Sequence, residues 1–231
     1  MTVATDAAVD LRGVRKSYRS PAGSVRVLDY VDLSIAPGEV VALSGRSGSG
    51  KTTLLTIVAG WDEPDAGTTT VLGDDAARPH AWRDVAIVPQ SLGLLDELTI
   101  AENVTLPIRL ARARHALEPD TIMTRLGIHH LADRYPREVS LGEQQRAALA
   151  RAAVLSPRLL IADEPIAHQN HGWAEGMMLV VAELAAQGAC CLIATHNEVA
   201  FASADRVLEL YAGRLRPLAR RGELPARSVD T

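Results

Sequence analysis

The sequence predicts an α/β fold in which a parallel sheet is connected by crossover helices. In the last third of the chain, alanine-rich helical segments separate three apolar runs, which are Leu159 to Ala162, Cys191 to Ala194 and Val207 to Leu210. Such alternation of strand and helix is typical of βαβ units. A further apolar run, Val40 to Leu43, leads through a glycine-rich loop into a helix that we expect from about Lys51 to Ala59.

The remaining segments predict two additions to this core. Val25 to Leu28 and Val31 to Ile35 are rich in strand-forming residues and are bounded by turn residues, whereas Val85 to Val88 indicates another buried strand of the core sheet. From Thr99 to about Gln145 the pattern is helical and polar, and three prolines interrupt it. We therefore expect a small antiparallel β-lobe and a helical lobe beside the core.

The whole chain of 231 residues is expected to form one domain. Its core and β-lobe take up about residues 9–90 and 147–215, and its helical lobe about residues 91–146. Residues 1–8 and 216–231 are expected to be mobile tails, the second rich in arginine.

Composition excludes several classes of protein. The net charge of −4 argues against a nucleic-acid partner. No run approaches the roughly 20 apolar residues that cross a bilayer, so any role at a membrane requires a separate partner. The adjacent Cys190 and Cys191 lie in an apolar strand, where neighbours face opposite sides, and they are expected to fill the core.

Residues 45–52 match the pattern G-x-x-x-x-G-K-[ST] of a phosphate-binding loop. Glycines let several N–H groups point at one phosphate, and the helix that follows adds its dipole. Lys51 is suited to reach the β- and γ-phosphates, and the Thr52 hydroxyl to ligate Mg²⁺. An accidental glycine-rich turn is the alternative, which the strand–loop–helix context opposes. We assign nucleotide binding to Gly45, Arg46, Ser47, Gly48, Ser49, Gly50, Lys51, Thr52 and Thr53.

Two carboxylates end the apolar run that begins at Leu159. Ligands of parallel sheets bind at the carboxyl ends of strands, so Asp163 is expected beside Thr52 and is suited to hold Mg²⁺. Glu164 is placed to orient the attacking water or to accept its proton. A solvated turn is the alternative interpretation, and the phosphate loop upstream favours the functional one.

Gln90 and His196 each follow an apolar run in the same predicted sheet. A single glutamine or histidine is usually structural, but strand ends in one sheet converge. We expect both side chains near the γ-phosphate, Gln90 also as a ligand of Mg²⁺, and we count both with Glu164 as catalytic residues.

Taken together, the motifs resemble the nucleotide-binding domain of ABC transporters. The resemblance rests on residues 45–52, Gln90, Ser140-Leu141-Gly142-Glu143-Gln144-Gln145-Arg146, Asp163-Glu164 and His196, in that order. Residues 45–51, 101–107 and 162–165 look most like the lipoprotein-release and macrolide-export branch. The implied fold is a P-loop NTPase (RecA-like) core with an antiparallel β-subdomain and an α-helical subdomain.

The resemblance also implies partners and further site residues. Tyr18 would stack on the adenine of ATP. Gln90 and the helical lobe would contact a transmembrane permease, which would hold the chain at the cytoplasmic face of the membrane. A second ATP-binding domain would pair with this one, and Ser140 and Gly142 would cover the ATP of that partner.

The chain departs from the family pattern at two positions. The family signature is Leu-Ser-Gly-Gly-Gln or -Glu, and this chain has Leu141 at its third position. The loop after Glu164 usually ends in Leu-Asp, and here it ends in Gln169-Asn170. Tolerated drift explains both changes. The alternative is a heterodimer with one weak site.

We therefore expect an ATPase that drives a membrane transport or remodelling partner. The alternative is a catalytically weak regulatory subunit of a heterodimeric complex, which Leu141 and Asn170 favour and the intact Lys51, Asp163 and Glu164 oppose. Soluble ABC proteins of DNA repair or translation form a third class. They usually carry coiled-coil insertions or two fused cassettes, which do not fit in 231 residues.

Overall fold

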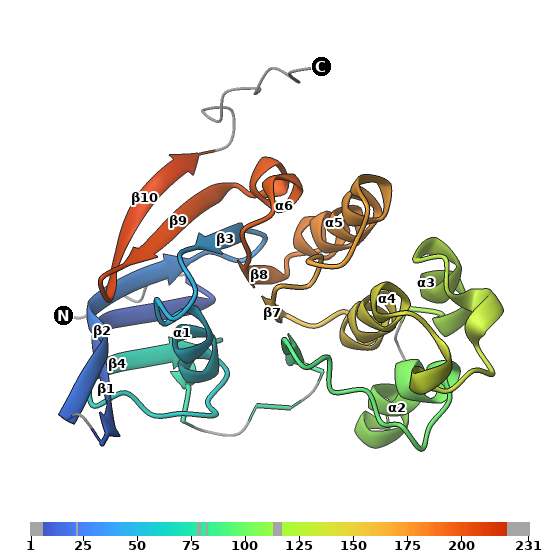
Figure 1. The fold of residues 1–231 in the computed structure, drawn as a ribbon, viewed down its shortest axis with the longest axis horizontal. Coiled ribbons are helices and arrows are strands. Elements are labelled where there is room, and N and C mark those ends of the chain that lie inside the picture. The colour runs from blue at the N-terminus through green and yellow to red at the C-terminus, as the bar shows by residue number, and fades with distance from the viewer. Residues whose placement is uncertain (1–6, 22, 78–79, 82, 113–116, 221–231) are drawn as a thin grey trace.

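The strands and helices are arranged as two sheets with a helical lobe to one side (Figure 1). The computed structural model describes residues 7–21, 23–77, 80–81, 83–112 and 117–220. In these residues, one sheet has the strand order β2-β1-β4-β5 and the other the order β10-β9-β3-β8-β7-β6. The strands are β1 (Val9–Ser20), β2 (Gly23–Ile35), β3 (Val40–Ser44), β4 (Ala66–Val71), β5 (Asp74–Asp75), β6 (Val85–Val88), β7 (Leu159–Asp163), β8 (Cys190–Ala194), β9 (Arg206–Tyr211) and β10 (Arg214–Arg220). The helices are α1 (Lys51–Val58), α2 (Ile100–Ala111), α3 (Pro119–Arg125), α4 (Leu141–Ala153), α5 (His171–Ala186) and α6 (Glu198–Ser203), with 3₁₀ turns η1 (His129–Leu131) and η2 (Pro136–Glu138).

The second sheet is the predicted parallel sheet. Parallel pairing joins β9 to β3, β3 to β8, β8 to β7 and β7 to β6. Helix α1 contacts β7 and β8 from the side of the first sheet, and α5 contacts β3 and β8. Strands β7 and β8 are buried over their whole length because both faces are covered. The carboxyl ends of β3, β7 and β8 therefore meet at one edge.

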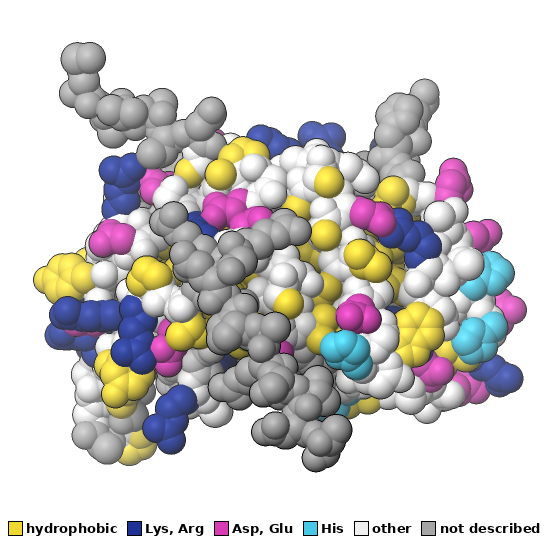
Figure 2. Space-filling view, turned by 90° about the horizontal axis from the view of Figure 1, so that it is seen from above, with side chains coloured by type: hydrophobic (Ala, Val, Ile, Leu, Met, Phe, Trp, Pro, Cys, Tyr) yellow, Lys and Arg dark blue, Asp and Glu magenta, His cyan; other side chains and the backbone are white. Residues whose placement is uncertain are grey.

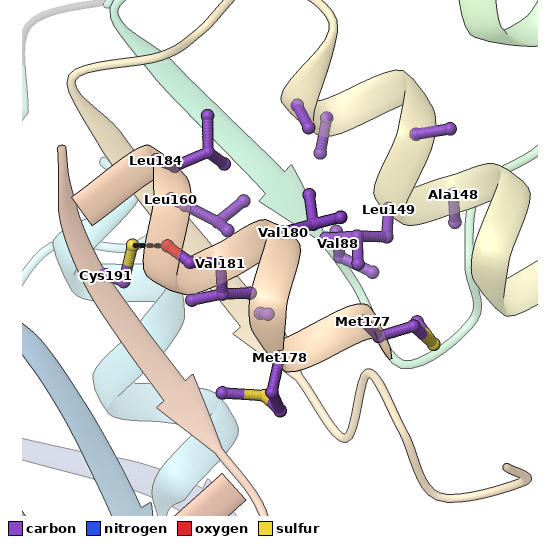
Figure 3. Packing of buried hydrophobic residues seen from close by; sticks show 14 of the residues in the cluster. Val88, Ala148, Leu149, Leu160, Met177, Met178, Val180, Val181, Leu184 and Cys191 are labelled. Carbon is purple, nitrogen blue, oxygen red and sulfur yellow. Dashed lines mark hydrogen bonds between the residues drawn. The ribbon is translucent and has the colours of Figure 1, made fainter. Parts of the chain in front are cut away.

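Side chains of β8 alternate between two hydrophobic cores. Cys191 packs in the core built with α4 and α5, and Cys190 packs in the core built with α1 and the first sheet. Figure 3 shows the first of these, where Val181 and Leu184 of α5 lie close to Leu160 and Cys191. Burial raises the pKa of the Cys191 thiol to about 12. The expectation that both cysteines fill the core is confirmed.

The first third of the chain differs from the prediction. The two predicted strands between Val25 and Ile35 are one strand, β2, in which Tyr30 adopts a positive φ of 55°. Strand β1 pairs with both β2 and β4, yet the sequence did not predict it. Its register shifts three times against β2, and such bulges interrupt the alternation of apolar and polar residues that identifies a strand.

The predicted tails, residues 1–8 and 216–231, extend too far into the folded part of the chain. Ala8 is 6% exposed and donates its N–H to the Ile35 carbonyl. Strand β10 reaches Arg220, although Pro217 disturbs its pairing with β9. Pro217 and the arginines around it interrupt the apolar pattern of a strand, so the sequence predicts a tail at this position. Residues 1–6 and 221–231 lie outside the described residues.

Two arginines of β10 form ion pairs. Arg214 contacts Asp29, and Arg216 contacts Glu209. Figure 2 shows basic and acidic side chains side by side over the end that holds β1 and β2, whereas histidines gather over the helical lobe. The predicted arginine run is therefore solvated and ion-paired in its described part. Within the described residues, no helix is both long and apolar enough to cross a membrane.

The helical lobe consists of α2, α3 and α4 with the two 3₁₀ turns. Helix α2 starts at a capping box in which Thr99 and Glu102 bond each other's backbone N–H groups. Asn103 is fully buried on α2 and binds the loop before it. Its Oδ1 accepts from the Leu95 N–H at 2.8 Å, and its Nδ2 lies 3.0 Å from the carbonyls of Leu95, Leu98 and Thr99. One side chain therefore fixes the path of the chain into the lobe.

We predict that Asn103→Ala destabilises the protein by about 1–3 kcal/mol, because buried backbone groups lose their partner. Urea unfolding followed by circular dichroism measures the change. Thr105→Ala is the control, because its hydroxyl bonds only carbonyls of its own helix, and its effect should stay within about 0.5 kcal/mol. Equal losses in the two variants would show that Asn103 has no special role.

Candidate active site

The phosphate loop follows β3 and ends at the first residue of α1. Its glycines adopt positive φ values, 153° at Gly45 and 103° at Gly50. A Cβ at Gly45 would lie 2.8 Å from the Leu210 carbonyl oxygen, and a Cβ at Gly50 would lie 2.6 Å from Val27 Cγ1. Only glycine fits at these positions. Gly50 is also the N-cap of α1, and no side chain caps this helix, so the loop forms an anion site of backbone N–H groups.

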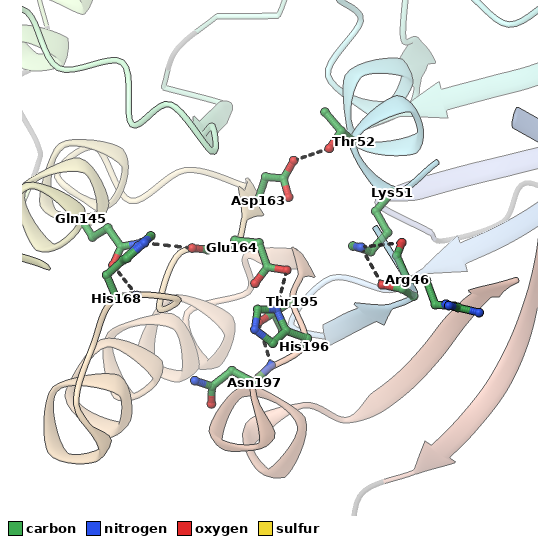
Figure 4. A network of polar contacts seen from close by, with 11 residues as sticks. Arg46, Lys51, Thr52, Gln145, Asp163, Glu164, His168, Thr195, His196 and Asn197 are labelled. Atoms are coloured by element: carbon green, nitrogen blue, oxygen red, sulfur yellow. Dashed lines mark hydrogen bonds and ion pairs between the residues drawn. The ribbon is translucent and has the colours of Figure 1, made fainter. Parts of the chain in front are cut away.

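Lys51 and Thr52 begin α1 and point in different directions. The Lys51 ammonium folds back over the loop and donates to the Gly45 carbonyl at 2.7 Å and to the Arg46 carbonyl at 3.3 Å. The Thr52 hydroxyl donates to Asp163 Oδ2 at 2.7 Å. Figure 4 shows both contacts. The positive charge therefore lies at the loop, and two of the three predicted metal ligands, Thr52 and Asp163, lie together beside it.

Strand register brings the acidic residues to this loop. Leu43 of β3 and Asp163 of β7 both pair with Ala194 of β8, from opposite sides. Asp163 is 6% exposed. Glu164, the next residue, has a positive φ of 50° and donates its N–H to the Ala194 carbonyl at 2.8 Å. The left-handed backbone at Glu164 turns the chain out of the sheet at the site.

Glu164 and His196 form a pair at the ends of β7 and β8 (Figure 4). His196 Nδ1 lies 2.9 Å from Glu164 Oε1. The Glu164 side chain is 15% exposed and that of His196 is 75% exposed. Glu164 Oε2 is buried without a hydrogen-bond partner among the described residues. A buried carboxylate oxygen with free acceptor capacity is suited to take a hydrogen bond from water.

Gln90 has a neighbour at the start of α1, and Tyr18 has one in the turn after it. Gln90 is exposed and lines a cavity of about 410 Å³ together with Thr52 and Asp163. Tyr18 belongs to β1, and its hydroxyl donates to Asp62 at 2.5 Å. Asp62 follows α1 and was not among the predicted site residues.

Ser140 and Gly142 lie on a different element, at the start of α4. The Ser140 hydroxyl donates to Glu143 Oε2 at 2.7 Å and accepts from the Glu143 N–H at 3.3 Å. Hydrogen bonds from Ser140 lower the pKa of Glu143. Leu141 is 46% exposed. Within the described chain, no hydrogen bond joins Ser140 or Gly142 to the phosphate loop.

A polar network that the sequence did not indicate joins α4 to the loop after Glu164. Gln169 Nε2 donates to the Gly142 carbonyl at 2.8 Å, and its Oε1 accepts from Arg146 at 3.0 Å. Gln145 Nε2 donates to the Glu164 carbonyl at 3.3 Å. The sequence signal for this network is weak, because Gln145 and Arg146 follow two other polar residues, Glu143 and Gln144, in the first half of α4. Asn170, the other departure from the family pattern, accepts from the Trp173 N–H and caps α5.

The comparisons with known proteins agree with this geometry. Residues 28–167 match the family model described as ABC transporter. The chain belongs to the ABC transporter family. It is 37% identical over 226 residues to a lipoprotein-releasing system ATP-binding protein of Maricaulis maris. The alignment covers 92% of this chain and 98% of the relative. It is 41% identical over 217 residues to the protein of the same name from Ruegeria pomeroyi, with 89% and 95% covered.

A solved structure has the same fold. The ATP-binding cassette MJ0796, described as dimeric, in a post-hydrolysis state and bound to ADP and Pi, is similar with a TM-score of 0.83 and 28% identity, over 93% of this chain and 99% of that one. The predicted P-loop core with its two subdomains is confirmed. The chain is an ATP-binding, ATP-hydrolysing subunit of the ABC transporter type, and no finding supports the alternative of a weak regulatory subunit.

We predict that Lys51→Ala abolishes detectable Mg-ATP binding in isothermal titration calorimetry, because it removes the cation at the loop. The thermal unfolding of the nucleotide-free protein should hardly change. Arg109→Ala removes one positive charge from an exposed position on α2 and should leave the affinity unaltered. An unchanged affinity in Lys51→Ala would contradict the assignment.

Proposed function

We propose that the chain binds Mg-ATP in the phosphate loop and hydrolyses it with Glu164 and His196 to drive a transmembrane partner. The observation that carries the proposal is the convergence of three strand ends at Ala194. It brings Asp163 within hydrogen-bond distance of Thr52 and Glu164 within hydrogen-bond distance of His196. Lys51 balances charge on the γ-phosphate, and the Glu164 carboxylate accepts a hydrogen bond from the attacking water.

The donor set fits Mg²⁺. The Thr52 hydroxyl and the Asp163 carboxylate are hard oxygen ligands that lie within hydrogen-bond distance of each other. Gln90 offers an amide oxygen and lines the same cavity. Mg²⁺ usually takes few protein ligands and completes its octahedron with waters and phosphate oxygens. When bound, the ion neutralises charge on the β- and γ-phosphates. Thr52 and Asp163 would hold the ion, and Gln90 would add a further ligand.

Glu164 has the contacts of a general base. Its Oε1 is beside the His196 ring, and its Oε2 is the buried acceptor without a partner among the described residues. His196 holds Oε1, so Oε2 is left to orient a water molecule. His196 is largely exposed on its remaining side, which leaves the ring able to contact the γ-phosphate.

A groove beside Gln90 is suited to the permease. It has a volume of about 420 Å³, lies between the core and α4, and is lined by Trp61, Pro107 and Arg151 among others. Arg151 of α4 donates to the carbonyls of Leu92 and Gly93, so the chain after Gln90 is fastened to the helical lobe. A permease segment in this groove would contact the segment after Gln90 and the helical lobe at the same time. It would also place the chain on the cytoplasmic face of the membrane.

A second ATP-binding domain completes the site. Ser140 and Gly142 carry helix N-terminal N–H groups, yet no hydrogen bond joins them to the phosphate loop of their own chain. The cassette MJ0796 is described as a dimer. We infer that α4 of one domain faces the ATP of its partner, either a second copy of this chain or a related subunit.

Glu164→Gln tests the chemical step. This variant should bind ATP normally, lose at least about 10²-fold in turnover because the water loses its proton acceptor, and accumulate the ATP-bound dimer. Steady-state phosphate release and size-exclusion chromatography measure the two effects. Asp74→Asn neutralises an exposed carboxylate in β5 and should behave like the unaltered protein. Turnover near the unaltered level in Glu164→Gln would favour a solvated turn.

Leu141→Gly tests the altered signature. An isobutyl group at the first residue of α4 obstructs the approach of phosphate to N–H groups. In a homodimeric complex, Leu141→Gly should raise the rate of phosphate release. In a heterodimeric complex it should change the rate little, because the faster site uses the signature of the partner. A lower rate in either assembly would show that Leu141 is an adapted contact.

A further inference from the structure

Tyr18 is held from two sides by residues outside the sequence motifs. Its hydroxyl donates to Asp62 Oδ2 at 2.5 Å, and the Lys16 ammonium lies 5.2 Å from the centre of its ring. Lys16 also donates to Asp62 Oδ1 at 2.5 Å and to the Glu63 carbonyl at 2.6 Å. Tyr18, Lys16 and Asp62 therefore form a closed triangle, which we call the tyrosine clamp.

The clamp is partly buried on its charged side and open at the ring. The side chains of Lys16 and Asp62 are 12% and 28% exposed, whereas Tyr18 is 41% exposed. A partly buried ion pair keeps a fixed geometry better than an exposed one, because solvent competes less for its charges. The exposed part of the ring remains available to a flat ligand.

Charge states in the clamp fix the direction of its hydrogen bonds. The hydrogen bond to Asp62 raises the pKa of Lys16. Burial, followed by the bond to Asp62, raises the pKa of Tyr18. Burial opposes ionisation of Asp62, but hydrogen bonds from Lys16 and Tyr18 outweigh it, and the pKa of Asp62 is lowered. At neutral pH the phenol is therefore the donor and the carboxylate the acceptor.

The clamp connects the tyrosine to the phosphate loop through one short helix. Asp62 lies in the turn that follows α1, and the first residues of α1 are Lys51 and Thr52. The same turn holds the β1 backbone, because Asp65 accepts from the Ser17 N–H at 2.7 Å. The eight residues of α1 and the turn that holds Asp62 therefore set the distance between the Tyr18 ring and the phosphate-binding groups at the start of α1.

We propose that Asp62, supported by Lys16, is a positioning residue that holds the Tyr18 ring as the platform for the nucleotide base. The proposal rests on the proposed function, ATP binding in the phosphate loop, and on the stacking of Tyr18 on adenine that the resemblance to ABC transporters implies. It adds that the contribution of the base to affinity depends on the carboxylate of Asp62. Within the described residues, the side-chain partners of Asp62 are Lys16 and Tyr18, and Asp62 has no hydrogen bond to Lys51 or Thr52. The clamp meets the start of α1 through the Tyr18 hydroxyl and Thr53. Binding of the phosphates therefore does not depend on the Asp62 carboxylate.

The experiment compares Mg-ATP with Mg-tripolyphosphate, which has the phosphates but no base. Calorimetry on the full chain gives both affinities for Tyr18→Ala, Tyr18→Phe, Asp62→Ala and Glu63→Ala. Tyr18→Phe keeps the ring and removes the hydroxyl, which bonds Asp62 and also contacts Thr53. Glu63→Ala removes a neighbouring exposed carboxylate and keeps the carbonyl that Lys16 contacts.

We expect Tyr18→Phe and Asp62→Ala to weaken ATP binding about three- to tenfold, because the ring loses its fixed orientation before binding. Tripolyphosphate affinity should be unchanged in both, and Glu63→Ala should change neither affinity. Thermal unfolding shows whether each variant is folded, and Tyr18→Phe serves as the conservative variant if Asp62→Ala does not fold.

Three results would overturn the inference or its basis, and each is distinct. If Tyr18→Ala leaves ATP binding unaltered, Tyr18 is not the base platform and the stacking role that the resemblance implies falls, while ATP binding in the phosphate loop still stands. If Tyr18→Ala weakens ATP binding but Tyr18→Phe and Asp62→Ala do not, the clamp does not position the ring. If Asp62→Ala weakens ATP and tripolyphosphate binding equally, Asp62 supports the phosphate loop and has no specific role toward the base.

Discussion

The hydrogen bond from the Thr52 hydroxyl to the Asp163 carboxylate joins parts of the chain that are 111 residues apart. It depends on parallel pairing, because Leu43 and Asp163 reach the same level of the sheet only through Ala194, which lies between them. A change of register by one residue would move Asp163 away from α1 and turn its side chain to the opposite face. The site therefore requires three buried strands in one register.

Burial on both faces is what makes this register secure. Every residue of β7 and β8 except Asp163 contributes to one of two hydrophobic cores, and their side chains alternate between them. The glycines of the phosphate loop add a second constraint, because Gly45 and Gly50 leave no space for a Cβ against Leu210 and Val27. A rigid sheet below and a tightly packed loop above preorganise the N–H groups before nucleotide binds.

The helical lobe is connected to the same site through side chains. Gln145 of α4 bonds the backbone of Glu164, and Gln169 in the following loop bonds the backbone of Gly142 at the start of α4. Arg151 fastens the other end of α4 to the segment after Gln90. A displacement of α4 by a partner would therefore reach both Glu164 and the segment after Gln90, because side chains of α4 are hydrogen-bonded to the backbone of both.

The sequence by itself determined the parallel core, the phosphate loop, and the placement of Asp163, Glu164 and His196 at strand ends. Those features follow from local patterns, since an apolar run followed by a polar residue fixes where a strand stops. Only the tertiary structure decided that β1 and β10 are strands, because bulges in β1 and Pro217 in β10 hide the pattern. The structure alone also gave Asp62 and Gln169 their partners. Those contacts join segments that are distant in sequence, and no local spacing encodes which polar side chains will meet.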